Sequence, residues 1–153
     1  MIQPMVDETL LEGLANDARC DDVQRFVVGA IVRHGDCVLL LRRSADDFMG
    51  GLLELPSGTV EPGESMDAAL IREVREETGL DVIRIETYLG HFDYEGRDGL
   101  KTRQFNFVVD VASPEPISLV EHSEYVWASP KKDLTVTDAV KRVLARYREL
   151  HSM

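Results

Sequence analysis

Apolar positions in the middle of the chain follow the two-residue period of β-strands. Between Arg25 and Ser44 they fill two runs on either side of His34-Gly35-Asp36, which predicts a β-hairpin turning at those residues. A second, longer hairpin is predicted over residues 81–111, with its turn at 96–99. The apolar positions that alternate along its second arm are Phe105, Phe107, Val109 and Val111. We expect that face of the arm to lie in the core.

Other stretches have the longer period of amphipathic helices. A helix is predicted over residues 65–78, with Ser65 as its N-cap and Gly79 in the left-handed position past its end. Its apolar stripe consists of Leu70, Ile71 and Val74. A short strand is predicted at 123–129, and a final helix at 137–150 turns Val140, Leu144 and Tyr147 inward. Together these elements predict one α+β domain with a mixed β-sheet.

The first 22 residues are predicted to form a helical extension ahead of a domain that spans residues 23–150. Residues 7–17 place Leu10, Leu11 and Leu14 on one helix face, and Asp7 or Thr9 is the expected cap. That face either docks on the domain or joins a second copy of the chain in a homodimer. Docking is the favoured interpretation.

Composition and charge narrow the class of function. The chain has 153 residues, of which 44% are hydrophobic and 29% charged, which suits one globular domain. The net charge of -11 and the scattered basic residues argue against a nucleic-acid polymer as partner. A small anionic ligand is compatible with this charge if a metal ion shields it.

Localisation is inferred from the cysteines and the apolar runs. Cys20 and Cys37 lack the spacing of a zinc site or a disulfide scaffold, which favours a reduced, cytoplasmic setting. The N-terminus lacks the basic region of a signal peptide, and the longest apolar runs are too short to cross a membrane. We therefore expect a cytoplasmic protein with no membrane contact.

One charge cluster opposes the ordinary design of a helix. Glu73, Glu76 and Glu77 fall in the last turns, where the helix dipole disfavours carboxylates and where the three repel one another. Arg72 and Arg75 are the nearby cations. A solvated charged face is the ordinary explanation for such a helix. The concentration of carboxylates at the unfavourable end instead favours a bound divalent cation, and oxygen ligands suit Mg²⁺ or Mn²⁺.

The stretch GTVEPGESMDAALIREVREETGL, which starts at Gly58, joins this cluster to a tight, glycine-marked loop. It resembles the Nudix box, Gx5Ex7REUxEExGU, where U is a bulky aliphatic residue. The fixed positions are filled by Gly58, Glu64, Arg72, Glu73, Val74, Glu76, Glu77, Gly79 and Leu80. With the flanking elements, the resemblance covers roughly residues 23–150 and is greatest to the small MutT-like members. It implies a Nudix α/β/α sandwich and Mg²⁺-dependent hydrolysis of a nucleoside diphosphate linked to another group.

Carried over by position, the resemblance implies a metal site and its catalytic neighbours. The metal ligands would be the carboxylates of Glu73, Glu76 and Glu77 and the backbone carbonyl of Gly58. In MutT-like members the glutamate at the position of Glu73 is the general base, whereas other Nudix enzymes take the base from elsewhere. Arg72 would orient the carboxylates and completes the expected catalytic set with Glu73 and Glu76. The expected cofactor is Mg²⁺, with Mn²⁺ as a substitute.

Three further residues extend the implied site. Glu64 would brace the loop on the substrate side and reach a metal through water. Glu121 resembles a downstream acidic residue that joins the metal site in some members, and an exposed loop glutamate is an equal alternative. Arg43 is a candidate contact for a substrate phosphate or base, although a surface arginine is the more ordinary interpretation.

Departures from the family pattern bear on the substrate. Ser57 stands where a glycine usually precedes the box. Near Thr137-Asp138 there is no asparagine, which MutT-type members use to recognise an oxidised guanine. The proline that marks many ADP-ribose hydrolases is also absent, because Pro114 is the first proline after Pro62. By exclusion, the expected reaction splits a (deoxy)nucleoside triphosphate into a monophosphate and pyrophosphate.

The alternatives to this reaction are a nucleotide-sugar or dinucleotide pyrophosphatase of the ADP-ribose type, and a non-catalytic domain that senses a nucleotide.

Four aromatic residues are candidates for stacking on a base, although packing is favoured for each: Phe48, Phe92, Tyr94 and Trp127. The histidines, His122 among them, have no spacing typical of a metal site or a catalytic triad. Most such histidines are structural or exposed.

Overall fold

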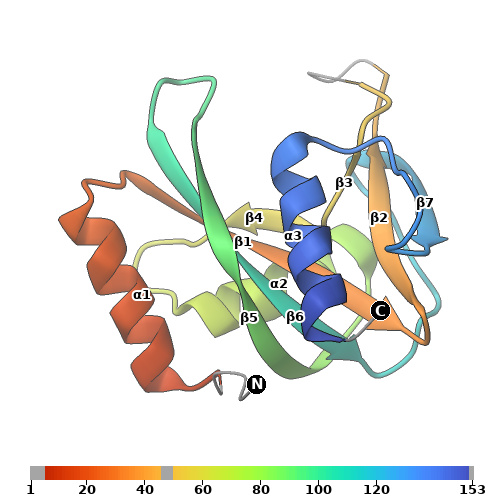
Figure 1. Ribbon diagram of the computed structural model, residues 1–153, viewed down its shortest axis with the longest axis horizontal. Coiled ribbons are helices and arrows are strands. Elements are labelled where there is room, and N and C mark those ends of the chain that lie inside the picture. Colours follow the sequence, from red (N-terminus) through yellow and green to blue (C-terminus); the bar gives the residue numbers. More distant parts are fainter. Residues whose placement is uncertain (1–5, 46–49, 152–153) are drawn as a thin grey trace.

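The computed structural model describes residues 6–45 and 50–151. Within these ranges a seven-stranded mixed sheet lies between helices on both faces (Figure 1). The elements in chain order are α1 (Glu8–Cys20), β1 (Arg25–His34), β2 (Cys37–Arg43), β3 (Leu53–Glu54), β4 (Ser57–Thr59), α2 (Met66–Thr78), β5 (Val82–Glu95), β6 (Lys101–Val111), β7 (His122–Ala128) and α3 (Asp138–Leu150). The predicted α+β class and the α/β/α sandwich are confirmed.

The course of β1 positions the loop that leads into α2. The main strand order is β3-β2-β1-β6-β5, with β1 and β6 parallel and the other pairs antiparallel. Near its end, β1 pairs with β2 through Arg33 and His34, whereas earlier its Val27–Gly29 segment pairs with β4. Strand β7 continues the sheet on the other side of β2. Since β4 is held by β1, the residues that open the box are fixed to the centre of the sheet.

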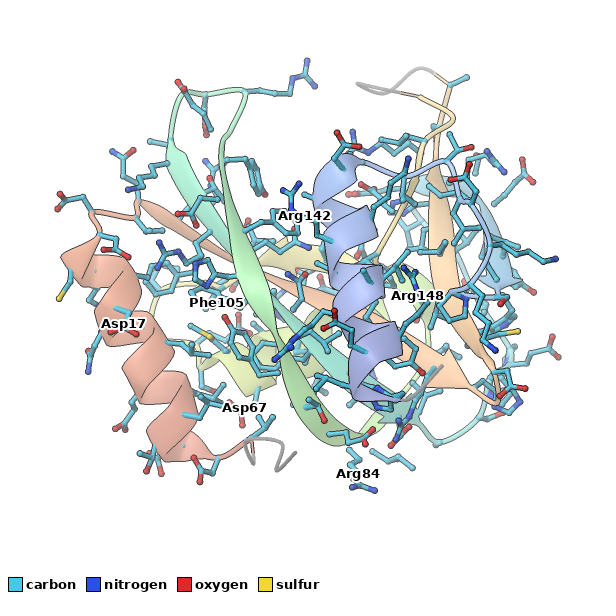
Figure 2. All side chains as sticks on the ribbon, viewed as in Figure 1. Asp17, Asp67, Arg84, Phe105, Arg142 and Arg148 are labelled. Atoms are coloured by element: carbon cyan, nitrogen blue, oxygen red, sulfur yellow. The ribbon has the colours of Figure 1, made fainter. Side chains whose placement is uncertain are left out.

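Two apolar cores cover the two faces of the sheet. Helices α1 and α2 pack on one face, over Val28, Val32, Phe105 and other strand residues, whereas α3 packs on the opposite face around Ile31, Leu40 and Val108 (Figure 1). Figure 2 shows the side chains that fill the space between α1 and the strands, around Phe105. Both faces of β6 are therefore covered, and residues 102–109 are all buried.

Helix α1 forms as the sequence predicts and extends three residues further, to Cys20. Asp7 is its N-cap and accepts a hydrogen bond from the Leu10 N–H at 2.9 Å. Leu11 and Leu14 pack against the first core. The structure therefore agrees with the docking interpretation of this helix face.

Helix α2 differs from its predicted apolar stripe at one position. Leu70 and Val74 are buried as expected, but Ile71 is 43% exposed, so its inclusion in the core was wrong. The residues that α2 buries are Met66, Ala69, Leu70, Val74 and Thr78. These positions follow the i, i+4 spacing of one narrow helix face, and Ile71 lies beside that face. Gly79 ends the helix with φ 78°, as the sequence predicts.

Candidate functional site

Arg72 is the centre of the charged network on α2. Its Nε and Nη2 donate to the two carboxylate oxygens of Glu64, each at 2.8 Å. Its Nη1 donates to Glu73 at 2.7 Å and to Glu76 at 3.2 Å, and Nη2 also donates to the carbonyl oxygen of Thr59 at 3.0 Å. One guanidinium thus links the loop after β4 to two carboxylates of the helix. These bonds hold the pKa of Glu64 at about 2, well below its usual value.

Gly58 permits a close approach between β4 and α2. A Cβ added at this position would overlap the carboxylate carbon and both carboxylate oxygens of Glu73. A larger residue would therefore displace either the strand or the glutamate. Glycine at this position therefore leaves the space that the Glu73 carboxylate occupies.

Glu77 is a partly buried acid that is held at one oxygen. Its side chain is 15% exposed, and its Oε1 accepts the Ser57 N–H at 2.6 Å. Burial raises its pKa to about 8, and burial also raises the pKa of Glu73. A divalent cation would supply the positive charge that these carboxylates lack, and their oxygen atoms suit a hard ion.

A cleft of about 540 Å³ gathers the predicted metal ligands. It is lined by Ser57, Gly58, Thr59, Glu61, Glu73, Glu76, Glu77, Val120 and Glu121. Glu121 is exposed, and its backbone carbonyl accepts a hydrogen bond from the Ser44 hydroxyl at 3.0 Å. Residues that are more than forty positions apart in sequence thus meet in one cleft. Glu64 and Arg72 lie behind this lining and act on it through their ion pairs.

The carboxylates of the cleft are separated by their present partners. Across residues 6–45 and 50–151, no three acidic, histidine or cysteine side chains are arranged as a preassembled metal site. Arg72 binds Glu73 and Glu76, whereas the backbone of Ser57 holds Glu77. The residues therefore fit a divalent cation by their chemistry, and small side-chain movements are needed for them to converge on one ion.

Sequence reasoning missed a second network, beside Glu77. The Arg43 Nε donates to Oε1 of Glu54 at 2.8 Å, and His122 Nε2 lies 2.6 Å from Oε2 of the same carboxylate. This carboxylate raises the pKa of His122. Burial alone would raise the pKa of Glu54, but the bonds to His122 and Arg43 outweigh it and lower that pKa. The three residues come from β3, β2 and β7, so no local spacing in the sequence relates them.

The candidate base-stacking residues are spread over the molecule. Trp127 packs against the first core, with its ring centroid 5.9 Å from that of His34. Phe92 packs against the second core. Tyr94 is 42% exposed, with its ring 6.0 Å from that of Phe92. Phe48 lies outside the described residues.

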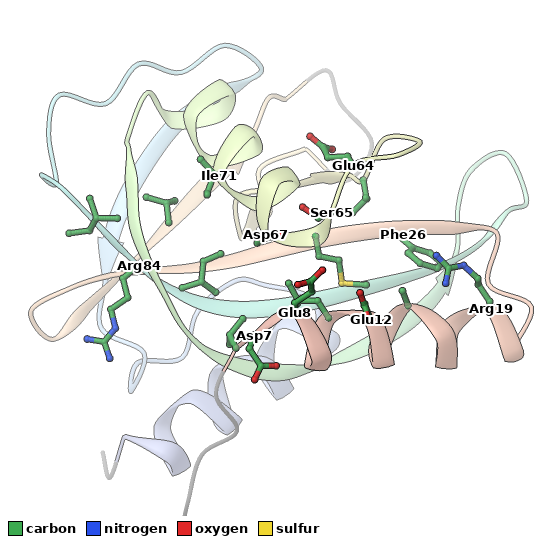
Figure 3. A pocket seen from close by; sticks show the side chains of 18 residues that line it. Asp7, Glu8, Glu12, Arg19, Phe26, Glu64, Ser65, Asp67, Ile71 and Arg84 are labelled. Atoms are coloured by element: carbon green, nitrogen blue, oxygen red, sulfur yellow. The ribbon is translucent and has the colours of Figure 1, made fainter.

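A larger hollow of about 660 Å³ lies between α1 and the start of α2, and Glu73, Glu76 and Glu77 do not line it (Figure 3). Figure 3 shows Ile71 of α2 on one side of it and Glu8 and Glu12 of α1 on the other. Its lining includes Glu64, whereas Glu73, Glu76 and Glu77 line the smaller cleft. The smaller cleft is therefore the candidate reaction site, because the carboxylates of Glu73, Glu76 and Glu77 line it.

In the part of the chain that the structure describes, the helices are too short or too polar to cross a membrane.

A family model described as "NUDIX domain" matches residues 23–147. The CTP pyrophosphohydrolase of Escherichia coli (strain K12) is 33% identical over 108 residues, which cover 71% of this chain and 78% of that protein. The ADP-ribose pyrophosphatase of Methanocaldococcus jannaschii is 37% identical over 71 residues, which cover 46% of this chain and 41% of that protein.

Solved structures share the fold. The solution structure of the E. coli ORF135 protein superposes with a TM-score of 0.74 and 29% sequence identity. The match covers 86% of this chain and 94% of that one. The likeness therefore includes the whole sandwich as well as the box.

Proposed function

The chain belongs to the Nudix family of pyrophosphohydrolases, and on this premise we propose that it splits a nucleoside triphosphate into a nucleoside monophosphate and pyrophosphate. The observation that carries the proposal is the cleft of about 540 Å³, in which the box carboxylates gather beside Gly58 and Glu121. The likeness to a CTP pyrophosphohydrolase over most of both chains supports a triphosphate substrate.

Nudix hydrolases generally use divalent metal ions, and in this chain we propose Mg²⁺, with Mn²⁺ as a substitute. The proposed ligands are Gly58, Glu73, Glu76, Glu77 and Glu121. When bound, such an ion supplies charge neutralisation of the phosphate oxygens and activation of a water molecule. The low exposure of the Glu77 side chain, which lacks a cationic partner at hydrogen-bond distance among the described residues, and the shared lining of the cleft support this assignment.

The protein's own groups have distinct proposed roles. Water attacks a phosphorus atom, the bridging P–O bond breaks, and Glu73 accepts the proton that the water loses. Arg72 keeps Glu73 in place through a hydrogen bond of 2.7 Å. The two hydrogen bonds from Arg72 to the Glu64 carboxylate fix the position of the guanidinium. Glu76, also bound by Arg72, completes the proposed catalytic set.

Arg43 and Glu64 are proposed to serve the substrate side of the site. Arg43 ends β2 next to the network of Glu54 and His122, and we propose that it contacts a phosphate or base. Both carboxylate oxygens of Glu64 bind Arg72, which favours the bracing role that the sequence implies. The hydrogen bond from Arg72 to the Thr59 carbonyl ties this brace to the end of β4.

A second candidate function is cleavage of a nucleotide sugar or dinucleotide. It is favoured by the likeness to an ADP-ribose pyrophosphatase, although that match covers less than half of either chain. A non-catalytic nucleotide sensor is disfavoured because every box glutamate is present and lies where Arg72 or Ser57 holds it.

A turnover screen with Mg²⁺ separates these functions. Standard and oxidised (deoxy)nucleoside triphosphates would be tested with inorganic pyrophosphatase. ADP-ribose and dinucleotides would be tested with alkaline phosphatase, which cannot attack them before they are cleaved. We expect phosphate to appear with pyrophosphatase, which reports pyrophosphate release from a triphosphate. Phosphate that appears only with alkaline phosphatase would move the substrate to the second class. Tight nucleotide binding without turnover would favour the sensor.

A further inference from the structure

His122 has one ring nitrogen that lacks a partner in a buried position. The side chain lies on β7 and is only 6% exposed. Among the described residues its Nδ1 makes no hydrogen bond, although solvent does not reach it. Native proteins rarely leave a buried polar atom unpaired, so this atom calls for a functional explanation.

The other ring nitrogen is firmly held. His122 Nε2 lies 2.6 Å from Glu54 Oε2, and Glu54 Oε1 accepts the Arg43 Nε at 2.8 Å. Arg43 and His122 are register partners on β2 and β7, and Glu54 comes from the neighbouring β3. Three paired strands therefore fix the direction in which the imidazole ring points.

That direction leads to Glu77. His122 Nδ1 is 3.9 Å from Glu77 Oε2, while the other oxygen of Glu77 accepts the Ser57 N–H at 2.6 Å. A movement of about 1 Å would bring Nδ1 and Oε2 to hydrogen-bond distance. His122 does not line the cleft, so it approaches Glu77 from the protein side rather than from the solvent side.

We propose that His122 is a positioning residue for Glu77. When the cleft takes up a divalent cation, Nδ1 of His122 forms a hydrogen bond with Oε2 of Glu77 while Nε2 keeps its contact with Glu54. The two bonds then orient the Glu77 carboxylate toward the cleft. This inference rests on the proposed function, because it requires Glu77 to serve a metal. Groups that hydrogen-bond to metal-ligating carboxylates typically contribute 10- to 100-fold in metal affinity.

Two isosteric substitutions distinguish the hydrogen bond at Nδ1 from the hydrogen bond at Nε2. The amide nitrogen of asparagine occupies the place of Nδ1, whereas that of glutamine occupies the place of Nε2. His122→Asn can therefore still donate to Glu77, and His122→Gln can donate to Glu54 alone. His34, the exposed last residue of β1, provides matched controls in His34→Asn and His34→Gln.

Mn²⁺ affinity, measured by the electron paramagnetic resonance of free Mn²⁺ and by calorimetry, is the primary readout. We expect His122→Gln to bind Mn²⁺ about 10- to 100-fold more weakly than wild type and His122→Asn to stay close to it. In turnover, KM for the metal should rise in His122→Gln more than kcat falls at saturating metal. If His122→Asn bound Mn²⁺ more weakly than His122→Gln, or if both variants bound it equally, the inference would be overturned. The proposed function would not be affected by that result.

A measurement on the wild type covers the case in which the variants fail to fold. The ring nitrogen resonances of His122 can be followed by NMR while Mg²⁺ is added. We expect the Nδ1 resonance to shift on addition of Mg²⁺, and no such shift in Glu77→Gln. An Nδ1 resonance that does not respond to Mg²⁺ would overturn the inference. Metal binding that is identical in wild type and Glu77→Gln would instead overturn the proposed function, and the inference with it.

Discussion

The Glu77 carboxylate should destabilise the metal-free fold at neutral pH. Its side chain is 15% exposed, and burial raises its pKa to about 8 from an ordinary value of 4.5. The folded protein therefore holds this proton more tightly than the unfolded chain does. The resulting stability is fully present below the unfolded pKa and is lost as the pH rises through the folded pKa.

The size of the effect follows from these values. One pKa unit corresponds to about 1.4 kcal/mol. By about pH 7 the ionisation of this side chain in the unfolded chain, while the folded protein keeps the proton, has therefore removed roughly 3 kcal/mol of unfolding free energy. Glutamine is neutral and keeps the oxygen that accepts the Ser57 N–H at 2.6 Å. Metal-free Glu77→Gln should therefore exceed wild type in stability by up to about 3 kcal/mol at about pH 7 and nearly equal it at about pH 5.

Urea unfolding in the presence of EDTA tests this prediction at both pH values. Glu76→Gln is the matched control, because the Glu76 side chain is 58% exposed and its bond to Arg72 is a surface ion pair. We expect it to change the unfolding free energy by less than about 1 kcal/mol at either pH. A Glu77→Gln protein that is no more stable than wild type at neutral pH would refute the claim that Glu77 is a buried, uncompensated acid.

Three further predictions follow from the packing and the site. Gly58→Ala should lower turnover by about 100-fold, because its Cβ displaces Glu73, while circular dichroism stays unchanged. Leu70→Ala should lower the unfolding free energy by about 2–5 kcal/mol, whereas Ile71→Ala should cost less than about 1 kcal/mol; equal effects would contradict the corrected stripe of α2. Mg²⁺ at about 100 times its dissociation constant should stabilise wild type by about 2.7 kcal/mol in thermal unfolding and leave Glu77→Gln nearly unaffected.

The parts of the site that are local in sequence could be predicted from it. The spacing of Glu73, Glu76 and Glu77 on one helix follows from the helical period, and Arg72 is close enough in sequence to reach two of them. Gly79 predicts the end of the same helix. These features depend on short-range geometry, which residue spacing determines.

Features that depend on tertiary contact could not be predicted in the same way. The link between Arg43, Glu54 and His122 arises because β7 pairs with β2 and β3 pairs with the opposite edge of β2. His122 has no spacing signal of its own, and its importance is apparent only from burial and from its distance to Glu77. Residue identity alone does not specify which strands become neighbours.

The wrong assignment of Ile71 and the incomplete one on β6 have the same origin. Ile71 has the hydrophobicity of a core residue, yet it borders the hollow between α1 and α2 because α1 does not cover it. On β6, alternation indicated one buried face, but α3 covers the other, so Val108 is also fully buried. Helix packing on each face of a sheet decides such positions, and hydrophobic period shows only one of those faces.

We propose that the cleft beside the α2 carboxylates performs metal-dependent hydrolysis of a nucleoside triphosphate. The most direct test measures pyrophosphate release with Mg²⁺ and with EDTA, for wild type and for Glu77→Gln. Circular dichroism would confirm that both proteins are folded. We predict release by wild type with Mg²⁺, none with EDTA, and loss of most activity in folded Glu77→Gln. A folded Glu77→Gln protein that releases pyrophosphate as fast as wild type would contradict the account.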